Sequence, residues 1–103
     1  MKELQKKVKE FCELHKLGCP LEFRILDLVS ELGEFAKEIV KSTNYGKEKF
    51  KFRKEIESEL GDLLFSLLVI ANQLNIDLEK ALNSVLKKYE ERIREKGTPS
   101  STR

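Results

Sequence analysis

Apolar residues recur along this chain at intervals of three and four positions, which is the spacing of one face of an α-helix. No stretch alternates apolar and polar residues in the way that a half-buried β-strand does. Turn-forming residues interrupt the helical pattern at residues 18–20, 42–46 and 75–77. Four helices are therefore predicted, over residues 2–16, 22–41, 49–74 and 78–96.

The fourth predicted helix has the clearest end signals. Asp77 precedes it as a good N-cap residue, and Gly97 follows it as a terminator. Short connections between four helices predict an all-α, four-helix bundle-like subunit. A length of 103 residues fits one domain over residues 1–97, and residues 98–103 are expected to form a disordered tail.

The apolar faces predict that the subunit does not act alone. In the second helix one broad face is apolar, formed by Ile25, Leu28, Val29, Leu32, Phe35, Ala36 and Ile39. The third helix is apolar almost all round between Leu63 and Leu74, and a helix of this kind is buried on every side. Since so small a chain cannot cover that helix by itself, we expect a homodimer or a dimer of dimers, which is a homotetramer.

Acidic residues form a stripe on each of these two helices. The stripes are Asp27, Glu31, Glu34 and Glu38 on the second helix, and Glu55, Glu59 and Asp62 on the third. Like charges at this spacing repel by roughly 0.2–0.5 kcal/mol per pair. An ordinary solvated face is one interpretation, and a divalent cation held by the carboxylates is the other, because Mg²⁺ takes hard oxygen ligands.

Three features favour the cation. The stripes lie on consecutive helices, so antiparallel packing can bring them together. None of Glu31, Glu34, Glu59 and Asp62 has a Lys or Arg four residues further on, as solvated helices commonly have. Gly33 and Gly61 lie inside the two stripes, where glycine weakens a helix by about 1 kcal/mol relative to alanine and often marks a close helix–helix approach.

The residue types limit which metal is expected. Di-iron helical bundles use histidine, but the single histidine, His15, lies outside both stripes. An all-oxygen site indicates Mg²⁺, with Mn²⁺ as a substitute. Cys12 and Cys19 flank His15, and reduced thiols explain them better than a zinc site, which would have four ligands at tighter spacing.

Charge and hydropathy limit the classes of partner. The formal net charge is +2, which gives no general attraction to nucleic acid or to a membrane surface. A basic cluster at Lys47, Lys49, Lys51, Arg53 and Lys54 leaves nucleic-acid binding as a minor alternative. The longest apolar-rich run, residues 63–71, is too short to span a bilayer. No secretory signal is recognised, so a cytoplasmic location is expected.

Two segments together resemble a known family. Residues 29–36, VSELGEFA, followed by residues 57–65, ESELGDLLF, resemble the paired E-E-x-x-E and E-x-x-D motifs of the MazG family. Residues 88–92, KYEER, resemble its K-[FY]-x-x-R element. The resemblance extends over roughly residues 22–96. Members are all-α nucleoside triphosphate pyrophosphohydrolases, related to the dimeric dUTPases and dCTP pyrophosphatases.

The resemblance implies a reaction and a set of site residues. The reaction is hydrolysis of a nucleoside triphosphate between its α and β phosphates, with Mg²⁺, to a monophosphate and pyrophosphate. The implied metal ligands are Glu31, Glu34, Glu59 and Asp62. Lys88 and Arg92 would bind the substrate phosphates, and Glu38, with Glu34 as the other catalytic carboxylate, would accept a proton from water.

Two positions depart from the family pattern. Ser30 occupies the place of the first glutamate in E-E-x-x-E, and Glu55 occupies a position that is basic in the family. If the missing carboxylate is needed, Asp27 or Glu38 takes its role. A non-catalytic helical interaction module that retains the fold is therefore the alternative function.

Overall fold

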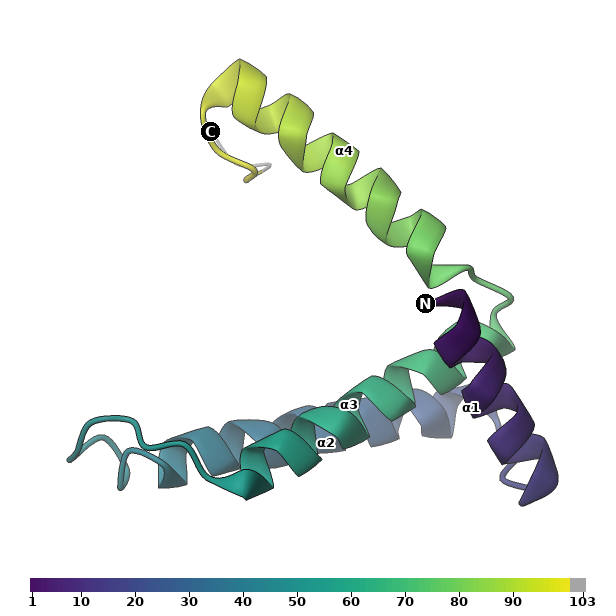
Figure 1. Cartoon of the computed structure of the whole chain (residues 1–103), viewed down its shortest axis with the longest axis horizontal. Helices are drawn as coiled ribbons and strands as arrows, with labels where there is room; N and C mark the ends of the chain where they lie inside the picture. The colour runs from purple at the N-terminus through teal and green to yellow at the C-terminus, as the bar shows by residue number, and fades with distance from the viewer. Residues whose placement is uncertain (101–103) are drawn as a thin grey trace.

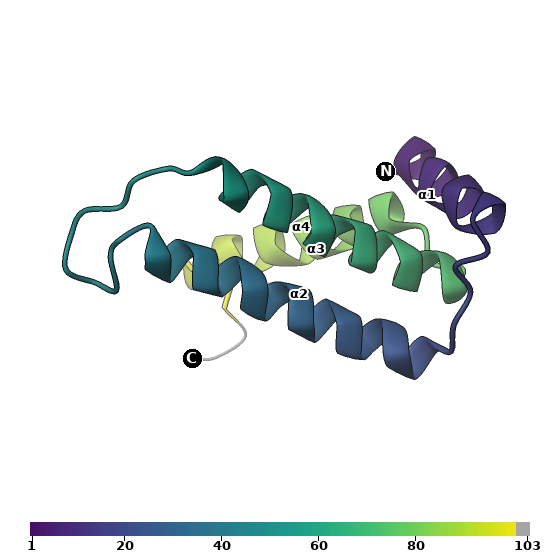
Figure 2. The same ribbon diagram turned by 90° about the horizontal axis from the view of Figure 1, so that it is seen from below.

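The computed structural model describes residues 1–100 and contains four helices. They are α1 (Lys2–Leu14), α2 (Leu21–Lys41), α3 (Lys54–Gln73) and α4 (Leu78–Lys96). No strand occurs among these 100 residues, so the predicted all-α class is confirmed. The helices α2 and α3 lie antiparallel, side by side, and α1 packs across the C-terminal half of α3 (Figure 1; Figure 2).

The core lies along α3. Within residues 1–100, all five buried apolar residues belong to this helix, namely Ile56, Leu68, Val69, Ile70 and Ala71. Phe11 of α1 meets Phe65 of α3 edge to face, with ring centroids 6.1 Å apart. The helix thus buries one side against α2 and another against α1, which accounts for part of its unusually apolar sequence, while Leu60, Leu64 and Leu67 stay exposed.

The predicted start of the third helix was wrong by five residues. The chain returns from α2 through a turn at Asn44, Tyr45 and Gly46, all at positive φ, and then runs extended to Arg53, where α3 begins. The Lys51 amide donates to the Ser42 carbonyl at 2.9 Å. Arg53 has an extended backbone, and its side chain donates hydrogen bonds to the end of α2. The helix α3 therefore cannot include Arg53 or the residues before it. The first helix also ends earlier than expected, at Leu14.

Both signals at the ends of α4 are confirmed. The Asp77 carboxylate accepts hydrogen bonds from the amides of Glu79 and Lys80, at 3.0 and 3.3 Å. Gly97 ends the helix at φ 78°, a left-handed conformation that glycine adopts without strain. The expected tail at residues 98–103 lies partly outside the described residues, since 101–103 are not described, and its disorder stays a prediction.

Gln5 fixes the junction between α3 and α4. Its buried side-chain amide donates to Asn72 Oδ1 at 3.1 Å and to the Ile76 carbonyl at 2.8 Å. Its side-chain oxygen accepts from the Leu78 amide at 2.9 Å. Asn72 returns a bond to the Gln5 carbonyl at 2.9 Å. One side chain of α1 therefore holds both the last turn of α3 and the first residue of α4.

The fourth helix departs from the other three. It leaves α3 at a bend of 102° and makes few contacts with α1, α2 or α3, so that α4 and the α2–α3 pair diverge like the arms of a V (Figure 1). No residue of α4 is buried. Four helices are present as predicted, but only three of them pack together within one chain.

Helix length and hydropathy determine whether a helix can cross a membrane. Within residues 1–100, no helix taken singly is long and apolar enough to cross a bilayer. Only α3 and α4 together reach the required length and composition, and the 102° bend lies between them.

Candidate metal centre

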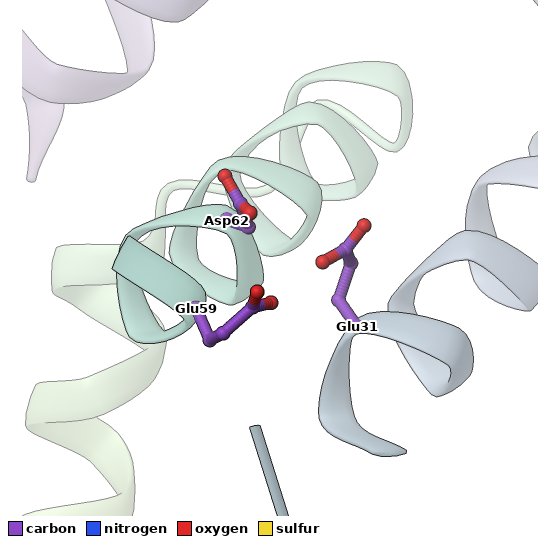
Figure 3. Close-up of side chains that lie close together, drawn as sticks. All are labelled: Glu31, Glu59 and Asp62. Atoms are coloured by element: carbon purple, nitrogen blue, oxygen red, sulfur yellow. The ribbon is translucent and has the colours of Figure 1, made fainter. Parts of the chain in front are cut away.

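The antiparallel pairing of α2 with α3 brings three predicted carboxylates together. Glu31 projects from α2 toward Glu59 and Asp62, which lie one turn apart on α3 (Figure 3). One oxygen from each of the three lies within 4.8 Å of the other two. Glu31 and Glu59 are half-buried, and Asp62 is exposed. The i, i+3 spacing on α3 and the pairing register with α2 together build this cluster.

The size of the cluster suits a small divalent cation. Mg²⁺ binds oxygens at about 2.0–2.1 Å, so two ligands on opposite sides of the ion lie about 4.2 Å apart. The separation of up to 4.8 Å between the three oxygens is only slightly wider. All three donors are hard carboxylate oxygens, which favours Mg²⁺ or Mn²⁺ over softer metals. The residues present therefore fit the expected metal.

The negative charge of the cluster is not neutralised by neighbouring side chains. In residues 1–100 the ion pairs involve other acidic groups, and Glu31, Glu34, Glu59 and Asp62 take part in none of them. The pKa of Glu59 is raised above its ordinary value, first by desolvation and then by the charges of Asp62, Glu31, Glu34 and Glu38. A bound cation would relieve this repulsion.

Glu34, the fourth predicted ligand, lies beside the cluster rather than in it. It is exposed on α2, and its charge contributes to raising the pKa of Glu59, but its oxygens are not among those within 4.8 Å. Ser30, which replaces the family glutamate, is exposed on the same helix next to Glu31. The cluster thus forms without a carboxylate at position 30.

Glu38, the predicted proton acceptor, is buried and paired. Its Oε1 lies 2.5 Å from Arg53 Nη2, and its Oε2 lies 3.7 Å from Lys41 Nζ. The hydrogen bond from Arg53 is the main cause that lowers the pKa of Glu38 below its ordinary value. A carboxylate stabilised in this way accepts a proton less readily.

Arg53 is the residue that sequence reasoning misassigned. It was grouped with the basic cluster of residues 47–54, although it also donates to the Glu38 carbonyl at 2.9 Å and to Ser42 Oγ at 3.0 Å. The available signal was the acidic Glu38, which precedes Arg53 by 15 positions and lies near the end of the second predicted helix. This signal could be interpreted only once it was known how α2 and α3 pair, because that pairing places Arg53 beside Glu38.

Lys88 and Arg92 are not brought to the carboxylates within one chain. Both lie on α4, with their charged groups 5.6 and 5.9 Å from the centre of the Tyr89 ring. Arg92 also donates to the Pro99 carbonyl at 3.2 Å. Because α4 diverges from the α2–α3 pair, the predicted phosphate-binding residues and the predicted metal ligands belong to separate parts of the subunit.

The predicted glycine contacts were wrong for the single chain. A methyl group built on Gly33 or Gly61 would meet nothing within 4 Å. Neither glycine therefore marks a close approach between α2 and α3, and the space beside each is open.

The part of the chain that carries the acidic cluster is similar to known proteins. Residues 22–96 match the family model described as the MazG nucleotide pyrophosphohydrolase domain. The protein YpjD of Bacillus subtilis (strain 168) is 36% identical over 103 residues, which cover 95% of this chain and 90% of that protein. The nucleoside triphosphate pyrophosphohydrolase/pyrophosphatase MazG of Thermotoga maritima is 44% identical over 41 residues, which cover 40% of this chain and 16% of that protein.

Solved structures agree in fold. The crystal structure of a Bacillus-conserved MazG protein, described as a nucleotide pyrophosphohydrolase, matches with a TM-score of 0.73 and 38% identity, covering 85% of this chain and 86% of that one. The crystal structure of YpjD from Bacillus subtilis matches with a TM-score of 0.71 and 40% identity, covering 89% and 94%.

Proposed function

Since the chain belongs to the MazG nucleotide pyrophosphohydrolase family, we propose that it is a Mg²⁺-dependent enzyme that hydrolyses a nucleoside triphosphate between its α and β phosphates. The products are a nucleoside monophosphate and pyrophosphate. The observation that carries the proposal is the uncompensated cluster of Glu31, Glu59 and Asp62, whose oxygens lie within 4.8 Å of one another. The proposal also includes a house-cleaning role and a cytoplasmic location.

In this proposal, three carboxylates form the metal site and two basic side chains form the phosphate site. Glu31, Glu59 and Asp62 would hold Mg²⁺, with Mn²⁺ as a substitute. When bound, the ion neutralises phosphate oxygens and increases the acidity of water. Lys88 and Arg92 would bind the phosphate chain and offset the charge that develops on the leaving pyrophosphate.

Glu34 is our first choice for the proton acceptor. It is exposed, it lies beside the cluster, and no cation holds it in an ion pair within residues 1–100. Its place as a fourth ligand stays a prediction. Glu38, the other candidate, is held by Arg53 and is better suited to orienting the end of α2. A Glu34→Gln variant should lose turnover, whereas Glu38→Gln should mainly lose thermal stability.

A panel of ribo- and deoxyribonucleoside triphosphates tests the function. Each is incubated with the protein and Mg²⁺, and the products are separated by ion-exchange chromatography. Equal amounts of monophosphate and pyrophosphate are expected, together with loss of turnover in Asp62→Asn. Release of orthophosphate and a diphosphate would contradict the proposed bond. Absence of both turnover and nucleotide binding would favour the non-catalytic module, for which Ser30 is the supporting feature.

A further inference from the structure

A pocket lies at the end of the α2–α3 pair where α1 crosses the C-terminal half of α3 (Figure 1). Its walls come from α1, from the linker between α1 and α2, from Arg24 of α2 and from the last turns of α3. Its volume is about 320 Å³, within the range of about 300–1,000 Å³ that is usual for small-molecule sites. Four segments that are distant in the sequence therefore share one concave site.

The pocket continues the helix faces that carry the acidic cluster. Arg24 lies seven residues before Glu31 on α2, and Val69 lies seven residues after Asp62 on α3. Seven residues are nearly two helical turns, so each pair shares one helix face, with a separation of about 10 Å along the axis. Because the two helices are antiparallel, both steps lead toward α1. This separation suits a nucleotide whose phosphates meet the metal centre and whose base enters the pocket.

Arg24 has a buried donor that lacks an acceptor. Its Nη2 donates to the Leu17 carbonyl, which holds the linker between α1 and α2. Its Nε is buried and has no hydrogen-bond partner, and it is the only such side-chain atom within residues 1–100. A buried donor without an acceptor costs free energy. A ligand in the pocket that offers an acceptor to this guanidinium would remove that cost.

Glu13 and Gln73 supply the complementary acceptors. Glu13 lines the same pocket as Arg24, yet among residues 1–100 it forms no ion pair with Arg24 or with any other cation. Gln73 donates its side-chain amide to the Cys19 carbonyl at 2.9 Å, and no group of residues 1–100 donates to its side-chain oxygen. Asn72 has both side-chain atoms bonded to helix α1. The pocket thus offers free donors and free acceptors from different walls.

We propose that this pocket recognises guanine, with Arg24 donating to O6 and N7 of the base and Glu13 accepting from N1–H and the N2 amino group. The inference rests on the proposed function for the nucleotide and adds the base. Arginine paired with O6 and N7 is the commonest specific contact to guanine. Gln73 offers an acceptor for the second amino hydrogen, and Cys12 and Val69 supply apolar surface for the ring.

The same groups disfavour the other bases. Adenine presents an amino donor beside N7, which the donors of Arg24 would oppose. Uracil and thymine place their single N–H between two carbonyl acceptors, so they offer no pair of adjacent donors to Glu13. Cytosine has two adjacent acceptors but only one donor group beside them. Guanine alone carries two adjacent acceptors next to two adjacent donors, so it satisfies both charged residues at once.

A comparison of bases is the first test. The ratio kcat/KM is measured with Mg²⁺ for dGTP, dATP, dCTP and dUTP. We expect the wild type to prefer dGTP by about 5-fold to 150-fold, the discrimination that one good bidentate pair supplies. Equal ratios for the four nucleotides, or a preference for any of the other three, would overturn the proposal.

Analogues that lack one group of guanine test each contact separately. 7-Deaza-dGTP lacks the N7 acceptor, and dITP lacks the N2 amino group, so the wild type should prefer dGTP to both. Arg24→Lys should lose only the discrimination against 7-deaza-dGTP, and Glu13→Ala only that against dITP. If Arg24 merely held the linker, Arg24→Lys would slow every nucleotide by the same factor, which would contradict its role. Glu10→Ala, an exposed position of α1 outside the pocket, should keep the wild-type preferences.

Protection of Cys12 from a thiol reagent separates this inference from the proposed function. In Cys19→Ser the remaining cysteine is Cys12, which lines the pocket. Saturating dGMP should slow its reaction with a maleimide at least about 5-fold, and dAMP at the same concentration should not. Protection by dGMP in a protein that hydrolyses no triphosphate would refute the function and leave the guanine pocket intact. Turnover without protection would refute the pocket and leave the function intact, and absence of both would overturn both.

Discussion

Arg53 at the start of α3 holds Glu38 near the end of α2 through two hydrogen bonds, one to the carboxylate at 2.5 Å and one to the backbone carbonyl at 2.9 Å. The same guanidinium reaches Ser42 Oγ at 3.0 Å. These contacts close the end of the α2–α3 pair away from α1. They join the two helices at that end, and α2 and α3 also carry Glu31, Glu59 and Asp62 of the candidate metal centre.

Replacement of Arg53 should loosen this end of the pair. We expect Arg53→Ala to lower the melting temperature at pH 7 by roughly 5 °C, because a buried carboxylate loses its main partner. Thermal unfolding followed by circular dichroism measures the change. The matched control is Lys54→Ala, the next residue, which is exposed and should change little.

The contribution of Glu38 should depend on pH. Because Arg53 lowers the pKa of Glu38 in the folded chain, the unfolded chain binds the proton more tightly. The stabilisation is therefore complete above the ordinary glutamate pKa of about 4.3 and disappears as the pH falls through the lowered folded value. The difference in melting temperature between wild type and Arg53→Ala should shrink steadily below about pH 4. An equal difference at pH 7 and pH 3 would show that the pair does not act through this charge.

Gln5 should be among the most sensitive polar side chains. In Gln5→Ala the Leu78 amide and the Ile76 carbonyl lose their partner at the α3–α4 junction. We expect the free energy of unfolding to fall by about 2 kcal/mol, measured by urea denaturation at fixed protein concentration. Lys6→Ala, at the exposed neighbouring position, should stay within about 0.5 kcal/mol of wild type. Similar values for both variants would contradict the role of this junction.

Removal of one carboxylate should abolish stabilisation by metal. Mg²⁺ or Mn²⁺ should raise the melting temperature of the wild type, and a chelator should reverse the effect. In Glu59→Gln the metal-free protein should be as stable as wild type or more so, since a repulsion is relieved, while metal affinity should fall at least about 100-fold. Glu91→Gln, an exposed position on α4, is the control and should respond to metal like the wild type.

Lys88 should affect substrate binding and not metal binding. Loss of a charged hydrogen bond to phosphate typically costs about 1.5–3 kcal/mol, so Lys88→Ala should raise KM by about 10-fold to 150-fold. Its melting temperature should still rise with Mg²⁺ as in the wild type. Lys87→Ala, the exposed neighbour, should keep the wild-type KM. An unchanged KM in Lys88→Ala would remove this residue from the phosphate site.

Local signals in the sequence were sufficient for the helices and for the grouping of three carboxylates. Helical spacing predicted four helices, and Asp77 and Gly97 marked the ends of α4 correctly. The i, i+3 spacing of Glu59 and Asp62 and their pairing with Glu31 were also foreseen. These features depend on neighbours in the chain or on the pairing of two consecutive helices.

Features that depend on distant contacts were missed. The extended segment before Arg53 looked helical because its residues have ordinary helix propensities, and only the bonds to the end of α2 explain its conformation. The sequence could not show that α4 packs apart from the other three helices. Its apolar residues Leu82, Leu86, Tyr89 and Ile93 could pack equally well against the same chain or against another one. A close approach between helices was predicted at Gly33 and Gly61, and the single chain does not make that contact.

The most direct test of the metal centre is a manganese-soaked crystal measured for anomalous scattering. Mn²⁺ takes the same hard oxygen ligands as Mg²⁺ and can be located without assuming its position. We predict an anomalous peak between the carboxylates of Glu31, Glu59 and Asp62. A crystal soaked at millimolar Mn²⁺ that shows no peak there, with the three side chains directed apart into solvent, would contradict the central claim.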